Sequence, residues 1–326
     1  MILDDKLSAA EAIVLDGAVG SEIARLGGVM DEAAWCGVAN RTHPAIVRRV
    51  HQEYIRAGCD VLTTNTFATC RHVLEGAGLG DETVAINTRA VELAREALDR
   101  VGPDRPVAIA GSMSNTLAWI PGSFSPDVRY VPTPAQEMEN YREMASTLAT
   151  AGVDLIVAEM MIDAERATRL ITAAMETGLP VWVGLSGSLA ADGSVTAWDI
   201  RKEEPLDRLI DADLRTEPSA FGTVVEALVE LGPQVVGVMH TKIESIGPAL
   251  EVLFRHWDGP VMVYPEVAGA HPAPPEAFAA SCRGWVERGV QIVGGCCGTT
   301  VEHIHAMVKA LPDSVGPRVH PGRNPG

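Results

Sequence analysis

Two adjacent cysteines, Cys296 and Cys297, are the residues of this chain that are best suited to chemistry. They lie in the stretch Gly294–Thr300, in which neighbouring glycines add little bulk and so leave room for two thiols to converge on one metal ion. Neighbouring cysteines rarely form a disulfide with each other, because a disulfide favours Cα atoms farther apart than adjacent residues allow. Two small buried hydrophobic residues are the plainer interpretation of such a pair. The glycines and the apolar run before them instead favour zinc ligation by both thiols.

A metal site needs further ligands from other parts of the chain, and the strands and helices of the fold have to bring these ligands together. Eight short apolar runs, rich in valine and isoleucine, predict β-strands. They cover residues 13–15, 61–63, 107–110, 155–158, 181–185, 235–239, 261–264 and 291–293. Nearly continuous apolar runs are typical of strands that are buried on both faces of a parallel sheet.

Helical patterns lie between these strands and cover residues 44–57, 83–101, 134–151, 164–177 and 221–231. Pro44 stands in a first helical turn and Gly58 follows the last one, which are helix start and stop signals. Eight strand–helix units predict an α/β fold of the (β/α)8 TIM-barrel type. A doubly wound open sheet is the alternative, but it usually carries a glycine-rich phosphate loop, and no early loop of this sequence has the required spacing.

The functional groups of a TIM barrel lie where its strands end. The predicted strand ends carry a concentrated set of polar residues, whose presence at the centre of an apolar barrel is costly unless they are paired. The set comprises Asp16, Gly17, Thr64, Asn65, Ser112, Glu159, Ser186, His240, Glu266, Cys296 and Cys297.

Two predicted connections are long, residues 113–133 and 186–220, and we expect them to be lids, substrate walls or ordinary decoration. We expect residues 1–311 to form a single domain. The tail, residues 312–326, is rich in proline, glycine and charge, and we expect it to be loosely ordered.

The bulk composition narrows the class of protein. The chain has 326 residues, of which 47% are hydrophobic, and this is enough for one large core. The net charge of −17 disfavours nucleic-acid binding, because an acidic surface repels phosphates. The sequence has no run of about 18 apolar residues and no secretion signal, so we expect no membrane contact. Six cysteines without a disulfide framework favour a reducing, cytoplasmic location.

Four motifs, in their order and spacing, resemble the homocysteine S-methyltransferase family of zinc-dependent barrels that methylate thiols. They are Leu15–Glu22, the block from Pro44 through His51 and Tyr54 to Phe67, Ala158-Glu159-Met160, and Gly294–Thr300 with the residues to Ile304. The last motif is the most specific. Met160 departs from the family, which usually has threonine there. The resemblance spans nearly the whole predicted barrel.

The resemblance implies a zinc site made by Cys296, Cys297 and a third cysteine at the end of the sixth strand. This chain has Gly237-Val238-Met239-His240 where the family has Gly-Val-Asn-Cys. Histidine is a sound zinc ligand, so we expect a His–Cys–Cys site with one open position. The alternative is that His240 is only a polar residue at the barrel mouth and that the metal site is damaged.

The substitution also changes the charge of the expected site. Zinc with two thiolates is neutral, whereas zinc with three thiolates carries a negative charge. A substrate thiol should therefore lose its proton more readily at this site, and its thiolate should be less nucleophilic.

The implied reaction is methyl transfer from an onium donor to the thiol of homocysteine, which gives methionine. By resemblance, Asp16, the Gly17 backbone and Glu159 hold the amino-acid end of homocysteine, since a carboxylate pairs with an ammonium. Thr64, Asn65 and Trp35 are the other expected substrate-binding residues. The alternative role of these substrate-binding candidates is to support the structure of the barrel mouth. The expected partners are a small-molecule thiol and a methyl donor, and homo-oligomer formation is left open.

Family donors include S-methylmethionine, S-adenosylmethionine, related sulfonium compounds and glycine betaine. A quaternary ammonium is best held in an aromatic cage, but only 5% of these residues are aromatic. Met160 takes the place of a cage residue, and the candidate walls are Trp35, Phe67, Trp119 and Trp182. A sulfonium donor is therefore favoured over betaine. Two alternatives are an acceptor module that works with a separate corrinoid methyl carrier, and a degenerate, non-catalytic barrel that binds zinc or thiols.

Overall fold

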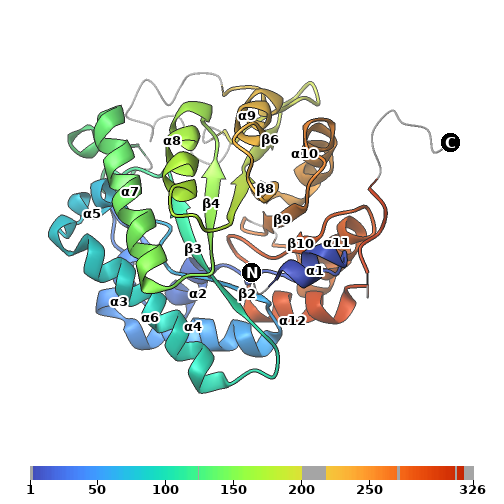
Figure 1. Ribbon diagram of the computed structural model, residues 1–326, viewed down its shortest axis with the longest axis horizontal. Coiled ribbons are helices and arrows are strands. Elements are labelled where there is room, and N and C mark those ends of the chain that lie inside the picture. The colour runs from blue at the N-terminus through green and yellow to red at the C-terminus, as the bar shows by residue number, and fades with distance from the viewer. Residues whose placement is uncertain (1–2, 124, 200–217, 270–271, 313, 319–326) are drawn as a thin grey trace.

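Eight parallel strands form the centre of the molecule in the computed structural model, which describes residues 3–123, 125–199, 218–269, 272–312 and 314–318 (Figure 1). The strands are β1 (Ile13–Val14), β2 (Val61–Thr63), β3 (Ala108–Ser114), β4 (Leu155–Met161), β5 (Val181–Leu185), β8 (Val235–Lys242), β9 (Val261–Glu266) and β10 (Ile292–Val293). Their order around the sheet is β1-β10-β9-β8-β5-β4-β3-β2. All eight predicted strands are confirmed.

The sheet closes into a barrel between its first and last strands. Leu15 forms a parallel bridge with Val61. On either side of this bridge, Asp60 N donates to Val14 O at 2.7 Å and Asp16 N donates to Val61 O at 3.1 Å. The predicted TIM barrel is therefore confirmed, and the open doubly wound sheet is excluded.

Helices surround this barrel, and every predicted helix begins at the predicted residue. The helices are α1 (Asp4–Ser8), α2 (Val19–Arg25), α3 (Ala39–Thr42), α4 (Pro44–Ala57), α5 (Arg71–Gly76), α6 (Thr83–Val101), α7 (Pro134–Ala151), α8 (Ala164–Met175), α9 (Phe221–Val229), α10 (Ile243–His256), α11 (Pro275–Val286) and α12 (Val301–Ala310). Helix α4 ends because Gly58 adopts a left-handed backbone with φ 110°, which glycine tolerates well. Helices α8 and α9 end two residues before their predicted ends.

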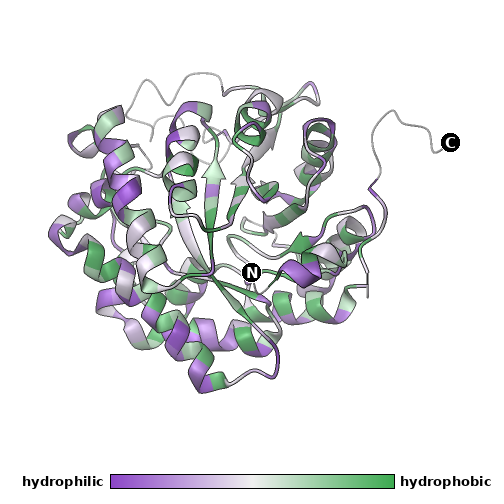
Figure 2. Cartoon of the chain, in the orientation of Figure 1, coloured by the Kyte–Doolittle hydropathy of each residue, from purple (hydrophilic) through white to green (hydrophobic). Residues whose placement is uncertain are grey.

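Alternate strand residues point to opposite sides, and this alternation builds two cores. One side faces the helices. The other fills the barrel interior with side chains such as Leu15, Trp182, Met239, Met262 and Tyr264. Hydrophobic colour accordingly runs along the central strands in Figure 2, while the outer helix faces are mixed. The interior is packed, so a substrate has to bind at an end of the barrel.

The long connection after β5 contains a short antiparallel hairpin made of β6 (Gly187–Leu189) and β7 (Val195–Ala197). Gly187 N donates to Thr241 Oγ1 at 2.9 Å and so fastens the hairpin to the end of β8. Residues 200–217 of this connection lie outside the described residues. The connection after β3 contains the short 3-10 helix η3 (Val128–Tyr130).

Part of the predicted tail is attached to the barrel. Val315 N donates to Ala10 O at 3.0 Å, and Gly316 N donates to Val286 O at 2.9 Å. The Arg318 guanidinium donates to the carbonyls of Trp257 and Gly259. These contacts join residues 315–318 to the barrel, while residues 319–326 lie outside the described part. The loose order of the tail stays a prediction. The single-domain boundary at residue 311 stays a prediction.

Among the described residues, no helix combines the length and the apolar character that a membrane crossing requires.

Candidate metal centre

His240, Cys296 and Cys297 converge at the carboxyl ends of the strands. Cys296 Sγ lies 3.5 Å from His240 Nδ1 and 3.9 Å from Cys297 Sγ. One ligand atom from each of the three residues lies within 4.8 Å of the other two. Zinc–sulfur bonds of about 2.3 Å and zinc–nitrogen bonds of about 2.0 Å place tetrahedral ligands about 3.8 Å (S to S) and about 3.5 Å (S to N) apart. The three side chains therefore fit tetrahedral zinc with one open position.

His240 reaches this point because strand β8 is bulged at its end. The register between β8 and β9 shifts between Met239 and Lys242. Within the bulge, His240 has φ 41°, and Thr241 Oγ1 donates to Met239 O at 2.7 Å. Bulges of this kind re-aim side chains, and strained backbone is concentrated at functional sites.

The cysteine loop after β10 is fixed by its two neighbouring strands. Cys296 N donates to Pro265 O at 2.9 Å, and Gly295 N donates to Asp16 O at 3.0 Å. The glycine frame allows this close approach. A Cβ atom at Gly294 would lie 2.7 Å from Leu15 Cβ. At Gly298, where φ is +79°, a Cβ would lie 2.7 Å from Ala268 N.

The two thiols are hydrogen-bonded to each other, and this contact shifts their pKa values in opposite directions. The hydrogen bond from Cys296, together with His240, lowers the pKa of the Cys297 thiol. The same hydrogen bond and burial raise the pKa of Cys296.

Two further side chains lie next to His240. Glu266 Oε2 lies 3.7 Å from His240 Nδ1, and the Glu266 side chain is 7% exposed. The indole ring of Trp198 lies against the imidazole, with ring centroids 5.5 Å apart and planes tilted by 60°. Glu266 belongs to the predicted polar set, whereas Trp198 lies in the long connection after β5 and has no sequence signal that marks it.

Asp16, which is buried, and Glu159, which is half-buried, supply carboxyl groups at the same end of the barrel. Ser112 Oγ donates to Glu159 Oε2, and burial raises the pKa of Glu159 to about 7. Asp16 accepts hydrogen bonds from Thr63 N at 2.7 Å and Thr63 Oγ1 at 2.5 Å. Burial nevertheless raises the pKa of Asp16 to about 8. A neighbouring positive charge would favour the ionised form of both groups, so an ammonium group suits them.

The hydrogen bonds described for Thr64 and Asn65 are made to other residues of the protein. Asn65 Nδ2 donates to Cys36 O at 2.9 Å and to Asn40 Oδ1 at 3.1 Å. Thr64 Oγ1 accepts from Ser112 N at 3.2 Å. These bonds support the barrel mouth, which is the alternative role stated above, and direct substrate contact by either residue stays a prediction.

Gly17 lies against Tyr54, and Trp35 lies against Phe67. A Cβ atom at Gly17 would lie 2.7 Å from Tyr54 Oη, so glycine is needed for this packing. Trp35 packs edge-to-face on Phe67, with centroids 6.0 Å apart, and its backbone has the strained φ of 44°. Their roles in substrate binding also stay predictions.

Trp182 is not a wall of the site. It is fully buried in the barrel interior, and its Nε1 donates to Gln234 Oε1 at 2.8 Å, just before β8 begins.

The other four cysteines, Cys36, Cys59, Cys70 and Cys282, are free and buried. They do not belong to the metal-binding group found among the described residues. His303 caps α12, since its ring nitrogen interacts with Thr300.

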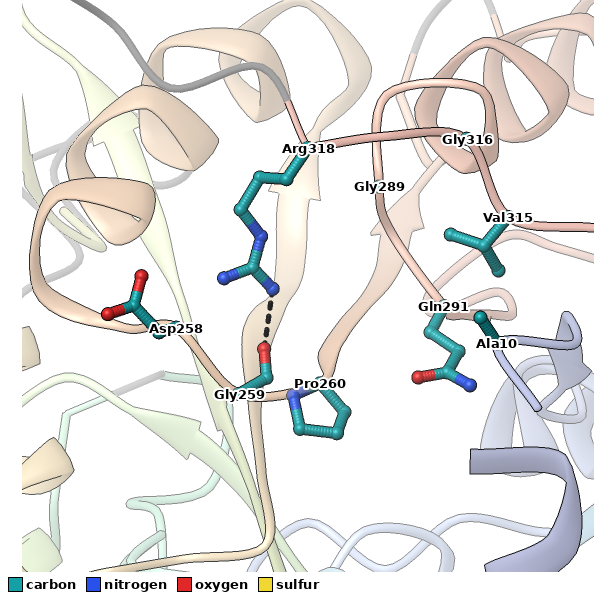
Figure 3. Close-up of a pocket in the computed structure, with 9 residues that line it drawn as sticks. All are labelled: Ala10, Asp258, Gly259, Pro260, Gly289, Gln291, Val315, Gly316 and Arg318. Atoms are coloured by element: carbon teal, nitrogen blue, oxygen red, sulfur yellow. Dashed lines mark hydrogen bonds between the residues drawn. The ribbon is translucent and has the colours of Figure 1, made fainter. Parts of the chain in front are cut away.

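A hollow lies at the end of the barrel opposite to the candidate metal centre, before β1, β9 and β10 begin (Figure 3). It has a volume of about 390 Å³. Arg318 extends into it and donates to Gly259 O, while Gln291 and Ala10 form another part of its wall. None of the predicted site residues lines it, so it is separate from the candidate metal centre.

A barrel that gathers two thiols, an imidazole and two carboxyl groups at its strand ends defines a class of α/β-barrel enzymes with a thiol-lined site. The sequence matches the homocysteine S-methyltransferase family over residues 13–311. The chain therefore belongs to this family and is a methyltransferase.

Individual relatives are distant but match over their full length. A selenocysteine methyltransferase from Astragalus bisulcatus is 24% identical, over 97% of both chains. The homocysteine S-methyltransferase YbgG of Bacillus subtilis is 25% identical, over 90% of this chain and 93% of its own length. The metallated crystal structure of the Escherichia coli homocysteine methyltransferase MmuM aligns with a TM-score of 0.69 at 22% identity, over 94% of this chain and 99% of that one. This likeness shows the shared barrel fold.

Proposed function

We propose that this protein transfers a methyl group from a sulfonium donor to the thiol of homocysteine, in a zinc-dependent reaction that gives methionine. The observation that carries the proposal is the spacing of His240, Cys296 and Cys297, which fits three corners of a zinc tetrahedron. Zinc held by these three residues would have its fourth corner open to an acceptor thiol. Bound there, zinc would act as a Lewis acid that favours the thiolate form of the acceptor near neutral pH.

Asp16 and Glu159 bind the ammonium group of the acceptor. Asp16 is buried and Glu159 is half-buried, so their attraction for a cation is screened less than at the protein surface. Thr63 and Ser112 orient them through hydrogen bonds. Holding the ammonium end fixes the direction in which the acceptor sulfur reaches the open corner.

The acceptor thiolate attacks the donor methyl carbon in line. A sulfur–carbon bond forms, the methyl bond to the donor sulfur breaks, and its electron pair stays on that sulfur. The donor leaves as a neutral thioether, and the thiol proton goes to solvent when the acceptor binds. Positioning both reactants at contact distance contributes most of the acceleration in such a transfer.

The relatives support the acceptor class but differ in the acceptor that their names give. YbgG and MmuM are homocysteine methyltransferases, and the Astragalus protein is a selenocysteine methyltransferase. We take homocysteine as the acceptor because it is the acceptor of the matched family. A cytoplasmic location and a part in methionine biosynthesis belong to the same proposal.

The test begins with metal content and continues with turnover. We expect about one zinc ion per reduced chain, and loss of that zinc in Cys296→Ala but not in the buried control Cys282→Ala. We then expect methionine from homocysteine with S-methylmethionine or S-adenosylmethionine, and less or none with glycine betaine. Selenocysteine is the competing acceptor.

Several results would contradict the proposal. A chain that binds no zinc after reconstitution would support the degenerate barrel. A zinc-loaded chain that is inactive with free onium donors, but active with a methylated corrinoid protein, would support the acceptor module.

A further inference from the structure

Trp198 is a large aromatic side chain that lies directly beside the candidate metal ligands. Its ring centroid is 5.5 Å from that of His240, and the two planes are tilted by 60°. Trp198 is half-buried, so the ring also borders the barrel mouth. Among the described residues, it is the aromatic side chain with a ring contact to a candidate ligand.

Hydrogen bonds fasten the backbone that carries the indole ring. Trp198 N donates to Ser186 O at 2.9 Å, at the end of β5. The next residue, Asp199, donates its N–H to Ser188 Oγ at 3.1 Å. The hairpin before Trp198 is bonded to Thr241, which directly follows His240. The ring and the candidate ligand are therefore fastened to the same strand end, and rigid support of this kind fixes a binding wall.

The indole N–H of Trp198 lacks an acceptor. Its Nε1 atom is buried and makes no hydrogen bond within the described structure. Most buried indole N–H groups have a partner. A ligand that brings an acceptor, such as a carboxylate, to this indole N–H would supply the missing hydrogen bond.

The negative charge around this wall selects the kind of ligand. Glu266 lies 3.7 Å from His240 on the neighbouring strand and is almost fully buried. An aromatic face attracts cations, since the ring carries negative potential on its face, and the Glu266 carboxylate beside His240 would add to this attraction. A neutral methyl donor gains neither interaction.

We propose that Trp198 forms the wall of the methyl-donor subsite and selects a sulfonium compound that also carries a carboxylate. The ring face contacts the positively charged methylsulfonium group, and the N–H is available to the carboxylate. This inference rests on the proposed function, because it places the donor beside the acceptor sulfur. It adds a specificity-determining residue from a connection that has no part in the metal site.

The test compares a cation with its neutral isostere in binding, without turnover. S-methylmethionine is titrated into the zinc-loaded protein by calorimetry, next to 2-amino-5-methylhexanoate, in which an uncharged CH group replaces the sulfonium sulfur. The variants are Trp198→Leu, which keeps apolar bulk, and Trp198→Phe, which keeps an aromatic face. The control is Trp257→Phe at the other end of the barrel, where the indole Nε1 already donates to Pro260 O at 2.8 Å.

We expect the wild-type protein to prefer the sulfonium compound. Trp198→Leu should reduce this preference roughly 2-fold to 30-fold, the range that corresponds to a cation–π contact, while Trp198→Phe should keep most of it. Zinc content and homocysteine affinity should not change. If Trp198→Leu does not fold, fluorinated tryptophan decides, because it should weaken sulfonium binding in the wild-type protein but not in Trp198→Phe.

Three results would overturn the inference. Equal weakening of both ligands in Trp198→Leu would reduce Trp198 to a packing residue. Loss of zinc together with donor binding would show that Trp198 acts through His240. If the wild-type protein binds no sulfonium compound at all, the donor class of the proposed function fails, and this inference fails with it.

Discussion

Asp16 provides the sharpest prediction, because its protonation should control acceptor binding. Burial raises the pKa of Asp16 to about 8, so in the ligand-free protein the carboxyl group is mostly protonated at pH 7. Binding of an ammonium group requires the carboxylate. The affinity for the amino-acid end of the acceptor should therefore rise with pH, and Asp16→Asn should remove this dependence.

The magnitude follows from the fraction of ionised carboxyl group in the free protein. For a pKa of about 8, this fraction rises about 50-fold between pH 6 and pH 8. Glu159, with a pKa of about 7, adds about 10-fold over the same range. Asp16→Asn should bind much more weakly at pH 8 and should keep only the smaller dependence that Glu159 provides.

The stability of the ligand-free protein should move the other way. The pKa of Asp16 in the folded state lies above its unfolded value of 3.8, so the folded state holds a proton that the unfolded chain releases. Stability should fall as the pH rises from about 4 to about 8. Asp16→Asn lacks this loss, so its melting temperature at pH 8 should exceed that of the wild-type protein.

The assay is calorimetric titration with methionine, which has the ammonium group of the acceptor but no thiol proton. Measurements are made at half-unit steps from pH 6 to pH 8. In this range the amino group of free methionine keeps its proton and its positive charge. Asp258→Asn, at the opposite end of the barrel, is the matched control. A wild-type affinity that is flat across this range, or an equally steep slope in Asp16→Asn, would refute the reasoning.

Three further predictions concern other parts of the structure. Glu266→Gln should weaken zinc binding about 10-fold to 100-fold in competition with a chromogenic chelator, because groups that surround metal ligands tune affinity to this extent; unchanged affinity would show that the carboxylate does not act on the metal. Gly298→Ala should destabilise the protein by about 1–3 kcal/mol in urea unfolding and reduce its zinc content, because φ is +79° and the added Cβ lies 2.7 Å from Ala268 N; a normal midpoint would contradict the close approach. Arg318→Ala should lower the melting temperature without changing zinc content, since it loses two carbonyl hydrogen bonds and the stacking on Phe254; an unchanged melting temperature would mean that the tail contributes nothing to stability.

The barrel could be predicted from the sequence because its signals are local. Each strand is a short apolar run, and Pro44 and Gly58 mark one helix at both ends. The strand ends extend beyond their apolar cores in β3, β4 and β8, where polar residues continue the pairing. Apolar patterning does not detect such extensions, since they depend on the neighbouring strand.

The site could be predicted only where residue type and strand position coincide. His240 and the two cysteines end predicted strands, and they do converge. The bulge that turns His240 inward depends on tertiary pairing between β8 and β9 and has no local signal. Trp198 lies far from any predicted strand, and only the folding of the hairpin back onto β8 brings it to the metal centre.

The charge of the centre connects the acceptor with the donor. Replacing a thiolate ligand by His240 removes one negative charge from the proposed zinc complex, which favours ionisation of the acceptor thiol. Glu266 places a buried carboxylate 3.7 Å from the His240 Nδ1 atom. A carboxylate outside the ligand set adds no electron density directly to the metal, but it still attracts a cation, by about 3 kcal/mol for unit charges about 5 Å apart at an effective dielectric constant of about 20. The proposed centre would thus ionise an acceptor thiol more readily than a three-thiolate site and would still attract a positively charged donor.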